Sequence, residues 1–485
     1  MIKRIDDILN SITMYRLILY YLILLLLAGF IYSIFGILPF SATSFAISIL
    51  FIVIVCFGVN KLFEKTFKAQ TNIESLFITA LILASILTPA KIINDFVFLF
   101  AASLIAMASK YILAIRTKHI FNPAAIGAVI GALVIGKYAS WWVGTLWMFP
   151  FTLLGILIVR KIRRFNLIFS FLIVNVIVTI LSNHSVVSLF TDSPILFFGF
   201  IMLTEPLTTP PTRFLQILYG ALTGILFAPL HFGAFFTTPE IALSIGNAFS
   251  YIVSPKQKLI LKLKEKLRLN KNTYDFIFTS QEKLKFKAGQ YLEWTLSQKN
   301  ADTRGNRRYF TIASAPTENE IRIGIKLPED EASSFKREMI DMKVGQEIIA
   351  SQLAGDFTLP NDNKKLLFIA GGIGITPYRS MIKYLIDTNI KRDIVLMYSE
   401  KNINEMVYKD VFKKAIEKLG IKVIYFETDK KGHMVADILV ANVADYKERN
   451  FYLSGSHVMV SAFENILKEL KIPKIQTKVD YFPGY

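Results

Sequence analysis

The chain has 485 residues, of which 53% are hydrophobic, and its mean hydropathy of +0.45 excludes an ordinary soluble protein. The formal net charge of +18 would suit a nucleic-acid partner, but the basic residues lie between apolar runs and from Lys256 to Arg268. Membrane topology and anionic lipid explain such charge better, so we predict no nucleic-acid partner. The single cysteine, Cys56, excludes an intrachain disulfide and an iron-sulfur cluster with cysteine ligands from this chain alone.

The apolar excess divides the chain into a membrane part and a globular part. Long apolar runs fill residues 1–253, whereas strands, helices and charged loops alternate after them. Within the globular part, short alternating strands give way near residue 360 to strand and helix in turn. We therefore predict a multi-domain protein, with a membrane domain at 1–253, an antiparallel β-barrel at 254–360 and a Rossmann-like α/β domain at 361–485.

The first domain is predicted to be a polytopic α-helical membrane domain. A transmembrane helix needs about 20 apolar residues, although a broken or buried helix can be shorter. Ten spans are predicted, at residues 15–38, 41–59, 75–87, 96–113, 123–135, 141–159, 167–181, 194–203, 214–230 and 239–253. The first run is too long for the core of a signal peptide, and no small-residue cleavage site follows it, so we expect this span to be retained.

The lysines and arginines set the expected orientation of these spans. If the N-terminus is cytoplasmic, sixteen basic residues fall on inside segments and only two, Lys91 and Lys137, fall on outside segments. An error of one span would scramble this asymmetry. We therefore predict a multi-pass protein of the cell (plasma) membrane, embedded in the lipid bilayer with both termini in the cytoplasm.

The membrane domain also contains two short internal matches. Residues 85–89 resemble residues 202–206, with Pro89 and Pro206 117 positions apart. Residues 122–126 resemble residues 238–242, with Pro123 and Pro239 116 positions apart. Chance is the alternative, because Thr-Pro is common at helix ends. Nearly equal offsets favour a five-span unit used twice, and an odd number of spans would place the two copies as an inverted repeat.

The residues around these prolines resemble a family of membrane flavoproteins. The segments 118–124 and 200–210, with Tyr219 and Gly220 after them, are similar to the signatures of the NqrB/RnfD family, which serves the sodium-translocating NADH:quinone reductase and the Rnf complex. The resemblance implies ten spans and a membrane-bound flavin, FMN or riboflavin. Its candidate binding residues here are Asn122, Thr204, Glu205, Thr208 and Thr209. Glu205 has two interpretations: an interfacial carboxylate satisfied by a helix N-terminus, or a group that handles cofactor, proton or cation.

The membrane cofactor is expected to be non-covalent flavin rather than heme. The family often attaches FMN to a threonine in an Asp-x-x-Ser-Gly-Ala-Thr motif, which this sequence lacks. Ferric reductases and NADPH oxidases join a similar C-terminal half to a heme-binding membrane half, but two bis-histidine hemes need four histidines within helices. The membrane half has only His119, His184 and His231, all near span ends. We predict no heme, no iron-sulfur cluster and no metal site.

In the globular part, the stretch Arg-Tyr-Phe-Thr-Ile-Ala-Ser at 308–314 predicts a strand and turn that seat a flavin. Alternate strand residues share a face, and a guanidinium pairs well with a pyrophosphate. Taken alone, the motif is better explained by a strand whose Arg and Thr face solvent. The order of motifs favours the flavin, because Phe286–Tyr291 precedes it by one hairpin and a glycine-rich turn at 371–377 follows it.

That glycine-rich turn predicts a nucleotide site. Leu366–Ala370 is an apolar run suited to a buried parallel strand. Gly371, Gly372 and Gly374 would let the backbone approach a nicotinamide nucleotide closely, and a helix is predicted from 378 to 386.

Together these motifs resemble the ferredoxin-NADP reductase family over residues 254–485, which implies FAD and NADH or NADPH. By this resemblance Arg308 holds the flavin pyrophosphate, Phe310 lies against the flavin ring and Thr311 lies near flavin N5. Plain helix capping is the alternative role for Ser333 and Ser334. The residues expected to bind the two cofactors are Arg308, Tyr309, Phe310, Thr311, Lys326, Ser333, Ser334, Gly371, Gly372, Gly374, Thr376, Pro377, Glu400, Gly455, Phe482 and Tyr485.

Three residues are predicted to act in catalysis: Thr311, Ser454 and Phe482. Ser454 stands where the family commonly has cysteine, and Phe482 lies in an aromatic tail resembling the one that covers the flavin until nicotinamide displaces it. Glu400 ends the next strand, predicted at 394–398, where NADP-selective relatives tend to carry arginine. A carboxylate accepts a ribose hydroxyl and repels a 2′-phosphate, so NADH is favoured over NADPH.

The predicted protein is a membrane-bound, NAD(P)H-dependent flavin oxidoreductase. It would pass electrons from cytoplasmic NADH through FAD to a flavin in the membrane domain, and on to a quinone or an extracytoplasmic acceptor. Two alternatives stay open. One is an NADH:quinone reductase without a membrane flavin, and the other is a redox-driven Na⁺ or H⁺ pump that uses Glu205 and the repeat.

Overall fold

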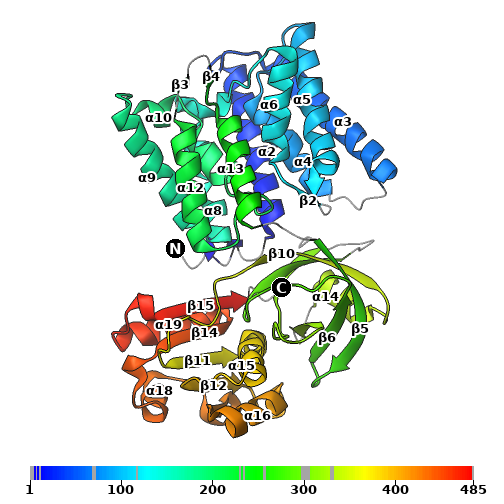
Figure 1. The fold of residues 1–485 in the computed structure, drawn as a ribbon. Helices are drawn as coiled ribbons and strands as arrows, with labels where there is room; N and C mark the ends of the chain where they lie inside the picture. Colours follow the sequence, from blue (N-terminus) through cyan, green and yellow to red (C-terminus); the bar gives the residue numbers. More distant parts are fainter. Residues whose placement is uncertain are drawn as a thin grey trace. The chain divides into compact units, whose positions relative to one another are not determined.

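The computed structural model describes residues 5–6, 8–9, 12–67, 73–115, 118–228, 231–232, 235–254, 258–296, 306–327 and 332–482. The chain forms two compact units, Met1–Gln257 and Lys258–Tyr485 (Figure 1). Each unit has hydrophobic clusters of its own, one in the first unit and three in the second.

The first unit has helices within every predicted span. Its longer helices are α2 (Met14–Ile34), α3 (Ala42–Phe67), α4 (Ile73–Ile86), α5 (Ile93–Ile112), α6 (Pro123–Ile135), α9 (Phe165–Leu181), α12 (Arg213–Phe227) and α13 (Pro239–Val253). Three of them, α2, α3 and α5, are long and apolar enough to cross a membrane. That all ten segments cross the bilayer stays a prediction.

The sixth and eighth predicted spans are broken helices. The sixth consists of η1 (Trp142–Gly144), η2 (Leu146–Met148), α7 (Phe149–Leu153) and α8 (Ile156–Ile162). The eighth joins α11 (Ile195–Phe197) to a five-residue π-helix, η3 (Phe198–Met202), whose residues are all buried. Single π turns are rare and frequently accompany functional sites.

The contacts between helices repeat after five spans. In the first half α2 packs on α4, α3 on both α4 and α5, and α5 on α6. In the second half α8 packs on η3, α9 on both η3 and α12, and α12 on α13. Counted as spans, the same four pairs meet in both halves. In the first half α4 also packs on α5 and α6, pairs that are not matched among the stronger contacts of the second half, so the duplicated unit stays a prediction.

The second unit begins with a six-stranded sheet in the order β8-β7-β10-β5-β6-β9, in which all neighbours are antiparallel. Its strands are β5 (Lys258–Arg268), β6 (Thr273–Ser280), β7 (Tyr291–Thr295), β8 (Arg307–Thr311), β9 (Ile321–Lys326) and β10 (Glu347–Ala354). The end strands β8 and β9 contact each other, so the sheet curls into a barrel-like form. Helix α14 (Ser334–Asp341) packs on its core through Phe335 and Met339.

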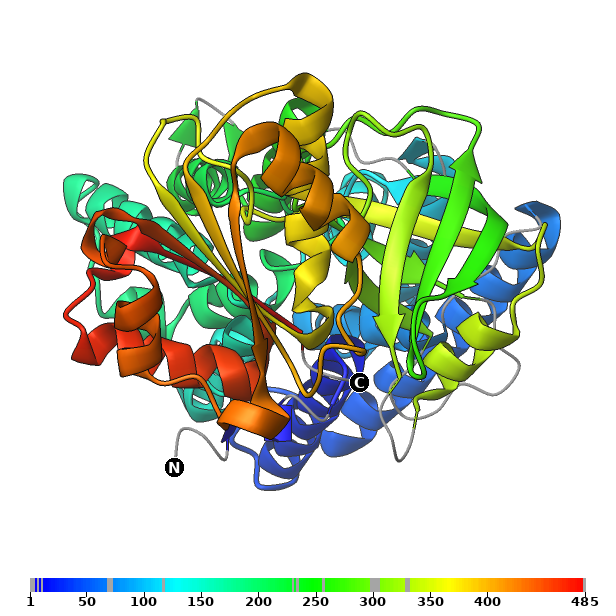
Figure 2. The ribbon, with the colours of Figure 1, turned by 90° about the horizontal axis from the view of Figure 1, so that it is seen from below.

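The second sheet of this unit has five parallel strands in the order β13-β12-β11-β14-β15. They are β11 (Leu366–Gly371), β12 (Ile394–Glu400), β13 (Lys422–Glu427), β14 (Asn450–Ser456) and β15 (Thr477–Phe482). Helices α15 (Thr376–Thr388) and α16 (Lys409–Leu419) pack on one face, and α18 (Ala436–Asn442) and α19 (His457–Glu469) on the other (Figure 2). Side chains alternate between these faces, so Phe368 lies toward α15 and Ile369 toward α19.

Two predicted elements are longer than expected. The helix after the glycine turn begins at Thr376 and ends at Thr388, because Thr376 and Pro377 occupy its first turn, where proline is tolerated. The strand predicted at 394–398 continues to Glu400, because its end pairs with β13.

Candidate functional site

The glycine-rich turn lies where β11 ends and α15 begins. Gly372 has φ +59°, a conformation that side chains disfavour. Gly374 lies so close to β14 that an added Cβ would be 2.3 Å from the carbonyl oxygen of Ser454. Both positions therefore require glycine, and the turn brings backbone N–H groups and a helix start to the carboxyl edge of the sheet. This edge is where open α/β sheets bind nucleotides.

The flavin-binding strand predicted from the sequence is β8. Arg308 is buried, and its guanidinium carbon lies 5.4 Å from the centre of the Phe335 ring. Phe310 lies 5.9 Å from that ring, centre to centre. Arg308 pairs in register with Trp294 and Phe310 pairs with Leu292, and both partners are core residues of the barrel.

Tyr309 lies on the other face of the strand. Its side chain is 44% exposed, and its hydroxyl donates to the Glu293 carboxylate over 2.7 Å. The Tyr291 ring packs edge-on against it. Strand alternation therefore separates Tyr309 from Arg308 and Phe310, although the motif predicts that all three bind cofactor.

Two buried hydroxyls at this site have no hydrogen-bond partner among the residues that the structure describes. Thr311 Oγ1 and Ser454 Oγ belong to side chains that are 3% and 0% exposed. A buried hydroxyl without a partner is costly and calls for an explanation such as a bound ligand. Thr311 ends β8 and Ser454 lies near the carboxyl end of β14, the two places where the sequence predicts contacts with flavin and nicotinamide.

Helix α15 holds the barrel and the parallel sheet together. Ser380 Oγ donates to the carbonyl oxygen of Ser314 over 2.6 Å, and Arg379 donates to that of Ala313 over 3.0 Å. Arg379 also forms an ion pair with Glu318. These contacts fix the segment after Thr311 against the helix that follows the glycine turn.

A buried carboxylate supports the same junction. Asp275 is fully buried on β6, accepts from Arg322 over 3.0 Å and accepts from the Tyr408 hydroxyl over 3.2 Å. Burial raises the pKa of Asp275 to about 6, although Arg322 and Arg379 oppose the shift. The Arg379 guanidinium lies over the Tyr408 ring, which closes the cluster.

Ser333 and Ser334 lie at the start of α14. Ser333 is the N-cap, and its side chain accepts from the backbone N–H of Lys336 over 3.3 Å. Capping is therefore an observed role of Ser333. Ser334 is the first residue of the helix. Lys336 extends from the same turn to the carbonyl oxygen of Lys326 over 3.3 Å.

Lys326 forms an ion-pair cluster with two glutamates at the end of β12. Its Nζ donates to both carboxylate oxygens of Glu400 over 2.9 Å and to Glu405 over 3.1 Å. Burial outweighs the lysine and raises the pKa of Glu400, whereas the two carboxylates outweigh burial and raise the pKa of Lys326. Glu400 also lies beside the turn, since an added Cβ on Gly372 would be 3.6 Å from Oε1.

The remaining predicted residues of this unit have mixed placements. Thr376 is buried and its hydroxyl donates to the carbonyl oxygen of Ile373, so that proton has a partner within the turn. Pro377 is buried in the first turn of α15. Gly455 lies against the Met459 sulfur, which an added Cβ would approach to 2.7 Å. Phe482 ends β15 with its backbone opposite Ser456, and Tyr485 lies outside the described residues.

In the first unit, the candidate residues gather around one carboxylate. Glu205 Oε2 accepts from Asn122 Nδ2 over 3.0 Å and from the Thr208 hydroxyl over 3.0 Å. His119 Nε2 lies 3.3 Å from Oε1. Thr204 instead donates to the carbonyl oxygen of Phe200, and Thr209 to backbone oxygen atoms that include that of Glu205. The structure thus brings together Asn122, Glu205 and Thr208 and directs Thr204 and Thr209 to the backbone.

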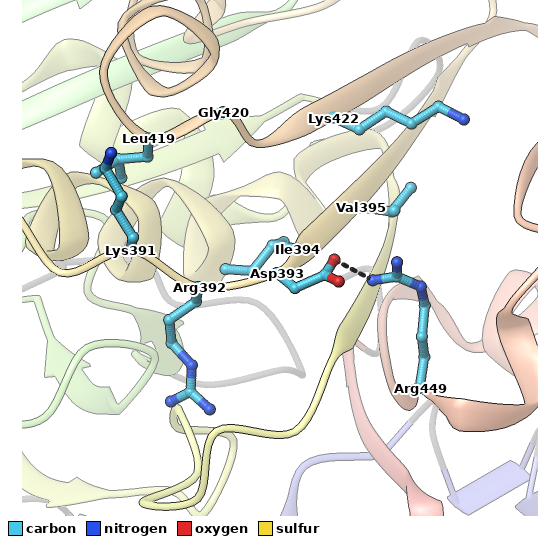
Figure 3. Close-up of a pocket in the computed structure, with 9 residues that line it drawn as sticks. All are labelled: Lys391, Arg392, Asp393, Ile394, Val395, Leu419, Gly420, Lys422 and Arg449. Carbon is cyan, nitrogen blue, oxygen red and sulfur yellow. Dashed lines mark hydrogen bonds and ion pairs between the residues drawn. The ribbon is translucent and has the colours of Figure 1, made fainter.

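A surface hollow of about 400 Å³ lies elsewhere on the parallel sheet (Figure 3). Its lining residues precede or begin strands β12, β13 and β14, so it lies at the amino edge, opposite the glycine turn. Arg449 and Asp393 pair across it over 2.7 Å. Because ligands of open α/β sheets bind at the carboxyl edge, this hollow is separate from the nucleotide site.

Several residues that shape these sites lie outside the predicted set. Arg379 and Asp275 are remote in sequence from the motifs, and only the packing of α15 against the barrel brings them there. From the sequence, His119 is considered individually only as a possible heme ligand. Its place in the 118–124 motif, three residues before Asn122, was the available signal.

Comparisons with known proteins match part of the chain. Residues 368–465 match the family described as "Oxidoreductase NAD-binding domain". Flavohemoprotein A of Dictyostelium discoideum is 24% identical over 205 residues, which are 40% of this chain and 52% of that protein. The glycine betaine monooxygenase reductase subunit of Chromohalobacter salexigens is 26% identical over 200 residues, 38% of this chain and 52% of that protein.

Among solved structures, the flavohemoglobin-like FAD/NAD-binding domain of the Vibrio cholerae nitric oxide dioxygenase is 17% identical, with a TM-score of 0.39. It covers 46% of this chain and 98% of that domain. The chain spans about half the length of the curated relatives it matches.

Proposed function

We propose that this chain, whose residues 258–485 form an NAD(P)H- and flavin-dependent oxidoreductase module like the ferredoxin-NADP reductases, carries electrons from NADH to an acceptor in or across a membrane. The module match rests on the NAD-binding family at 368–465. The single observation that carries the flavin assignment is the pair of buried, unpartnered hydroxyls of Thr311 and Ser454.

These residues fit the cofactors that the resemblance implies. Arg308 would hold the FAD pyrophosphate beside the start of α14, Phe310 would lie against the flavin ring and Thr311 would hydrogen-bond near its N5. Gly371, Gly372 and Gly374 would give the nicotinamide nucleotide close access to the backbone, with Ser454 beside the nicotinamide. When bound, FAD accepts a hydride and releases electrons singly, which no side chain of this chain can do. The Phe482 ring would cover the flavin in the absence of nucleotide.

We propose NADH as the preferred donor, because of the charge beside the glycine turn. Lys326 balances one of the two carboxylates, Glu400 and Glu405, so the cluster keeps one net negative charge. A 2′-phosphate would be repelled there, whereas ribose hydroxyls can donate to the carboxylate oxygens.

We propose that the membrane unit receives the electrons through a non-covalent flavin, FMN or riboflavin, and delivers them to a quinone or an extracytoplasmic acceptor. Support comes from the sequence resemblance, the duplicated packing of the helices and the cluster around Glu205. On this proposal the protein is a multi-pass protein of the cell (plasma) membrane with both termini in the cytoplasm.

The test is to purify the full chain in detergent, release its cofactors with acid and quantify the flavins by chromatography beside a heme spectrum. FAD together with FMN or riboflavin, and no heme band, is the expected result. FAD alone at one per chain would leave the membrane unit without a carrier and favour an NADH:quinone reductase that lacks a membrane flavin. A heme band would contradict the proposal.

A further inference from the structure

We infer that Glu205 and His119 form a proton-transfer site at one end of the membrane unit, through which an acceptor reduced in this unit takes up its protons. The inference rests on the proposed function and adds a chemical role to the site. It begins from the geometry, since His119 Nε2 and Glu205 Oε1 are 3.3 Å apart and their side chains are 11% and 20% exposed. An imidazole N–H and a carboxylate at this distance can share one proton.

The carboxylate is held in place by a hydrogen-bonded chain that continues into the helix bundle. Asn122 donates its Nδ2–H to Glu205 and its backbone N–H to Asn247 Oδ1 over 2.8 Å. Asn247 Nδ2 donates to the Tyr219 hydroxyl over 2.9 Å. Asn122, Asn247 and Tyr219 are all buried, so they orient Glu205 toward His119 rather than conduct protons. Tyr219 is the last residue of this hydrogen-bonded series, and Glu205 and Arg164 both interact with it electrostatically.

A small cavity with a mixed lining lies beside the histidine. Its volume of about 10 Å³ is at the lower limit of the space that one water molecule needs. Its lining residues are His119, Ile120, Leu207, Thr208, Asn247, Ser250, Tyr251 and Ser254. Thr208 links the cavity to Glu205 because its hydroxyl donates to Oε2 over 3.0 Å. A water here would have hydroxyl, amide and imidazole partners and would connect His119 with Thr208.

The donor set favours a proton over a metal cation. Among the described residues, no group of three or more histidine, cysteine, aspartate or glutamate side chains could hold a metal ion. A sodium ion would need the carboxylate oxygen that faces His119 and would be repelled whenever the imidazole is charged. The same arrangement suits a proton, because the imidazole N–H can point directly at the carboxylate oxygen over 3.3 Å.

A second buried carboxylate of this unit provides the contrast. Glu240 is 3% exposed, lies in the first turn of α13 and accepts from Trp141 Nε1 over 2.9 Å. Trp141 also donates its backbone N–H to Ile86, at the end of α4. Glu240 therefore joins the end of the third span to the start of the tenth, as Glu205 joins the end of the eighth to the start of the fifth. The indole of Trp141 can only donate its N–H, whereas an imidazole can both donate and accept a proton.

The proton balance defines the step. NADH leaves as NAD⁺ and gives up two electrons with a hydride, and a quinone that receives two electrons must also bind two protons to become a quinol. In the proposed site the Nε2–H of His119 gives its proton to the Glu205 carboxylate, which passes it to the reduced acceptor. The imidazole takes a proton from water at its other nitrogen, Nδ1, and is neutral again, while solvent resupplies the water. Two such transfers deliver the two protons of the quinol.

The experiment compares two acceptors on the full chain in detergent. Ferricyanide takes electrons without protons and reports the NADH-to-FAD step, whereas a water-soluble ubiquinone analogue needs both electrons and protons. Glu205→Gln and His119→Gln should each lower the quinone-to-ferricyanide rate ratio by at least about tenfold. Both variants should also shift the pH profile of quinone reduction, and Glu205→Asp should restore part of the ratio. Glu240→Gln, the matched control, should leave the ratio unchanged.

Several outcomes would overturn the site. One is an unchanged ratio in both variants, and another is a lowered ratio with an unaltered pH profile, which would mark a merely structural role. Quinone reduction that requires Na⁺ at fixed pH and loses this requirement in Glu205→Gln would assign the carboxylate to a cation instead. A wild-type protein that reduces ferricyanide but no quinone would refute quinone as the acceptor, and this site with it, while the extracytoplasmic acceptor of the proposed function would stand.

Discussion

At the scale of single residues, the site is defined by polar side chains whose surroundings change their chemistry. Thr311 and Ser454 retain unused hydroxyls in the core. Glu400, expected as a ribose ligand, is bound by Lys326 through both of its oxygens. Asp275, in contrast, is fully buried and has a strongly displaced pKa. The charge of Glu400 and the charge of Asp275 each lead to a testable prediction.

Replacing Glu400 with glutamine should weaken the preference for NADH. The change removes one negative charge beside the turn and leaves Lys326 paired with Glu405 alone. The ratio of kcat/KM for NADPH to that for NADH should rise on the order of tenfold, because like charges close together cost a few kcal/mol. Steady-state kinetics with ferricyanide as acceptor measure this ratio. Glu448→Gln, beside Lys365 and remote from the turn, is the control and should leave it unchanged.

The buried Asp275 predicts a pH dependence of stability. Its folded pKa of about 6 lies above its ordinary value of 3.8, so the folded state binds more protons between these limits. The free energy of unfolding should therefore fall as pH rises from about 4 to about 6, by on the order of 3 kcal/mol, and level off above.

The measurement is the midpoint of thermal unfolding of the second unit across this pH range. Asp275→Asn should flatten the slope, because the amide does not titrate and still accepts from Tyr408. A slope that is equal in both proteins would exclude Asp275 as its source.

At the scale of elements, close helix packing depends on glycines of the first unit. An added Cβ on Gly220 of α12 would be 2.5 Å from the carbonyl oxygen of Leu167 on α9, and one on Gly224 would be 2.7 Å from that of Phe171. The spacing of four residues places both glycines on one helix face. Backbones in contact tolerate no side chain there.

Gly220→Ala should therefore separate α9 from α12 and destabilise the unit, by about 1 to 3 kcal/mol or more. Gly58→Ala is the matched control, because Gly58 lies in α3 with nothing within 4 Å of an added Cβ. The control should be neutral or slightly stabilising, since alanine favours a helix. Thermal unfolding in detergent compares the two variants. Equal midpoints would show that α9 and α12 can move apart freely.

At the scale of the whole molecule, the two compact units predict a division of labour. Residues 258–485 contain both sheets, the glycine turn and their own hydrophobic clusters. Neither Thr311 nor Ser454 depends on a residue of the first unit for its place in a strand.

A protein of residues 258–485 alone should fold, because a domain with its own hydrophobic core can fold independently. It should bind FAD and reduce ferricyanide with NADH at a rate within about threefold of that of the full chain. It should not reduce a lipid-soluble quinone in vesicles, whereas the full chain should. Rapid quinone reduction by the isolated unit would show that the membrane unit carries no essential part of the path.

The sequence by itself determined the elements and the order of the motifs. Apolar runs set the positions of the helices in residues 14–253, since hydrophobic length and period are local properties. The strand before Gly374 and the glycine turn were likewise set by the local pattern of residues. The backbone of Gly374 lies against another strand, and such close contact leaves no room for a side chain. The module type followed from the same motifs.

Only the tertiary structure decided which side chains meet. Strand pairing set Tyr309 beside Glu293, away from Arg308, and the packing of two sheets joined Lys326 to Glu400. His119 and Asn122 precede Glu205 by 86 and 83 residues, and only the fold brings their side chains together. Such contacts depend on how distant elements pack, and local sequence carries little information about that, because packing is a sum over many weak and non-specific contacts.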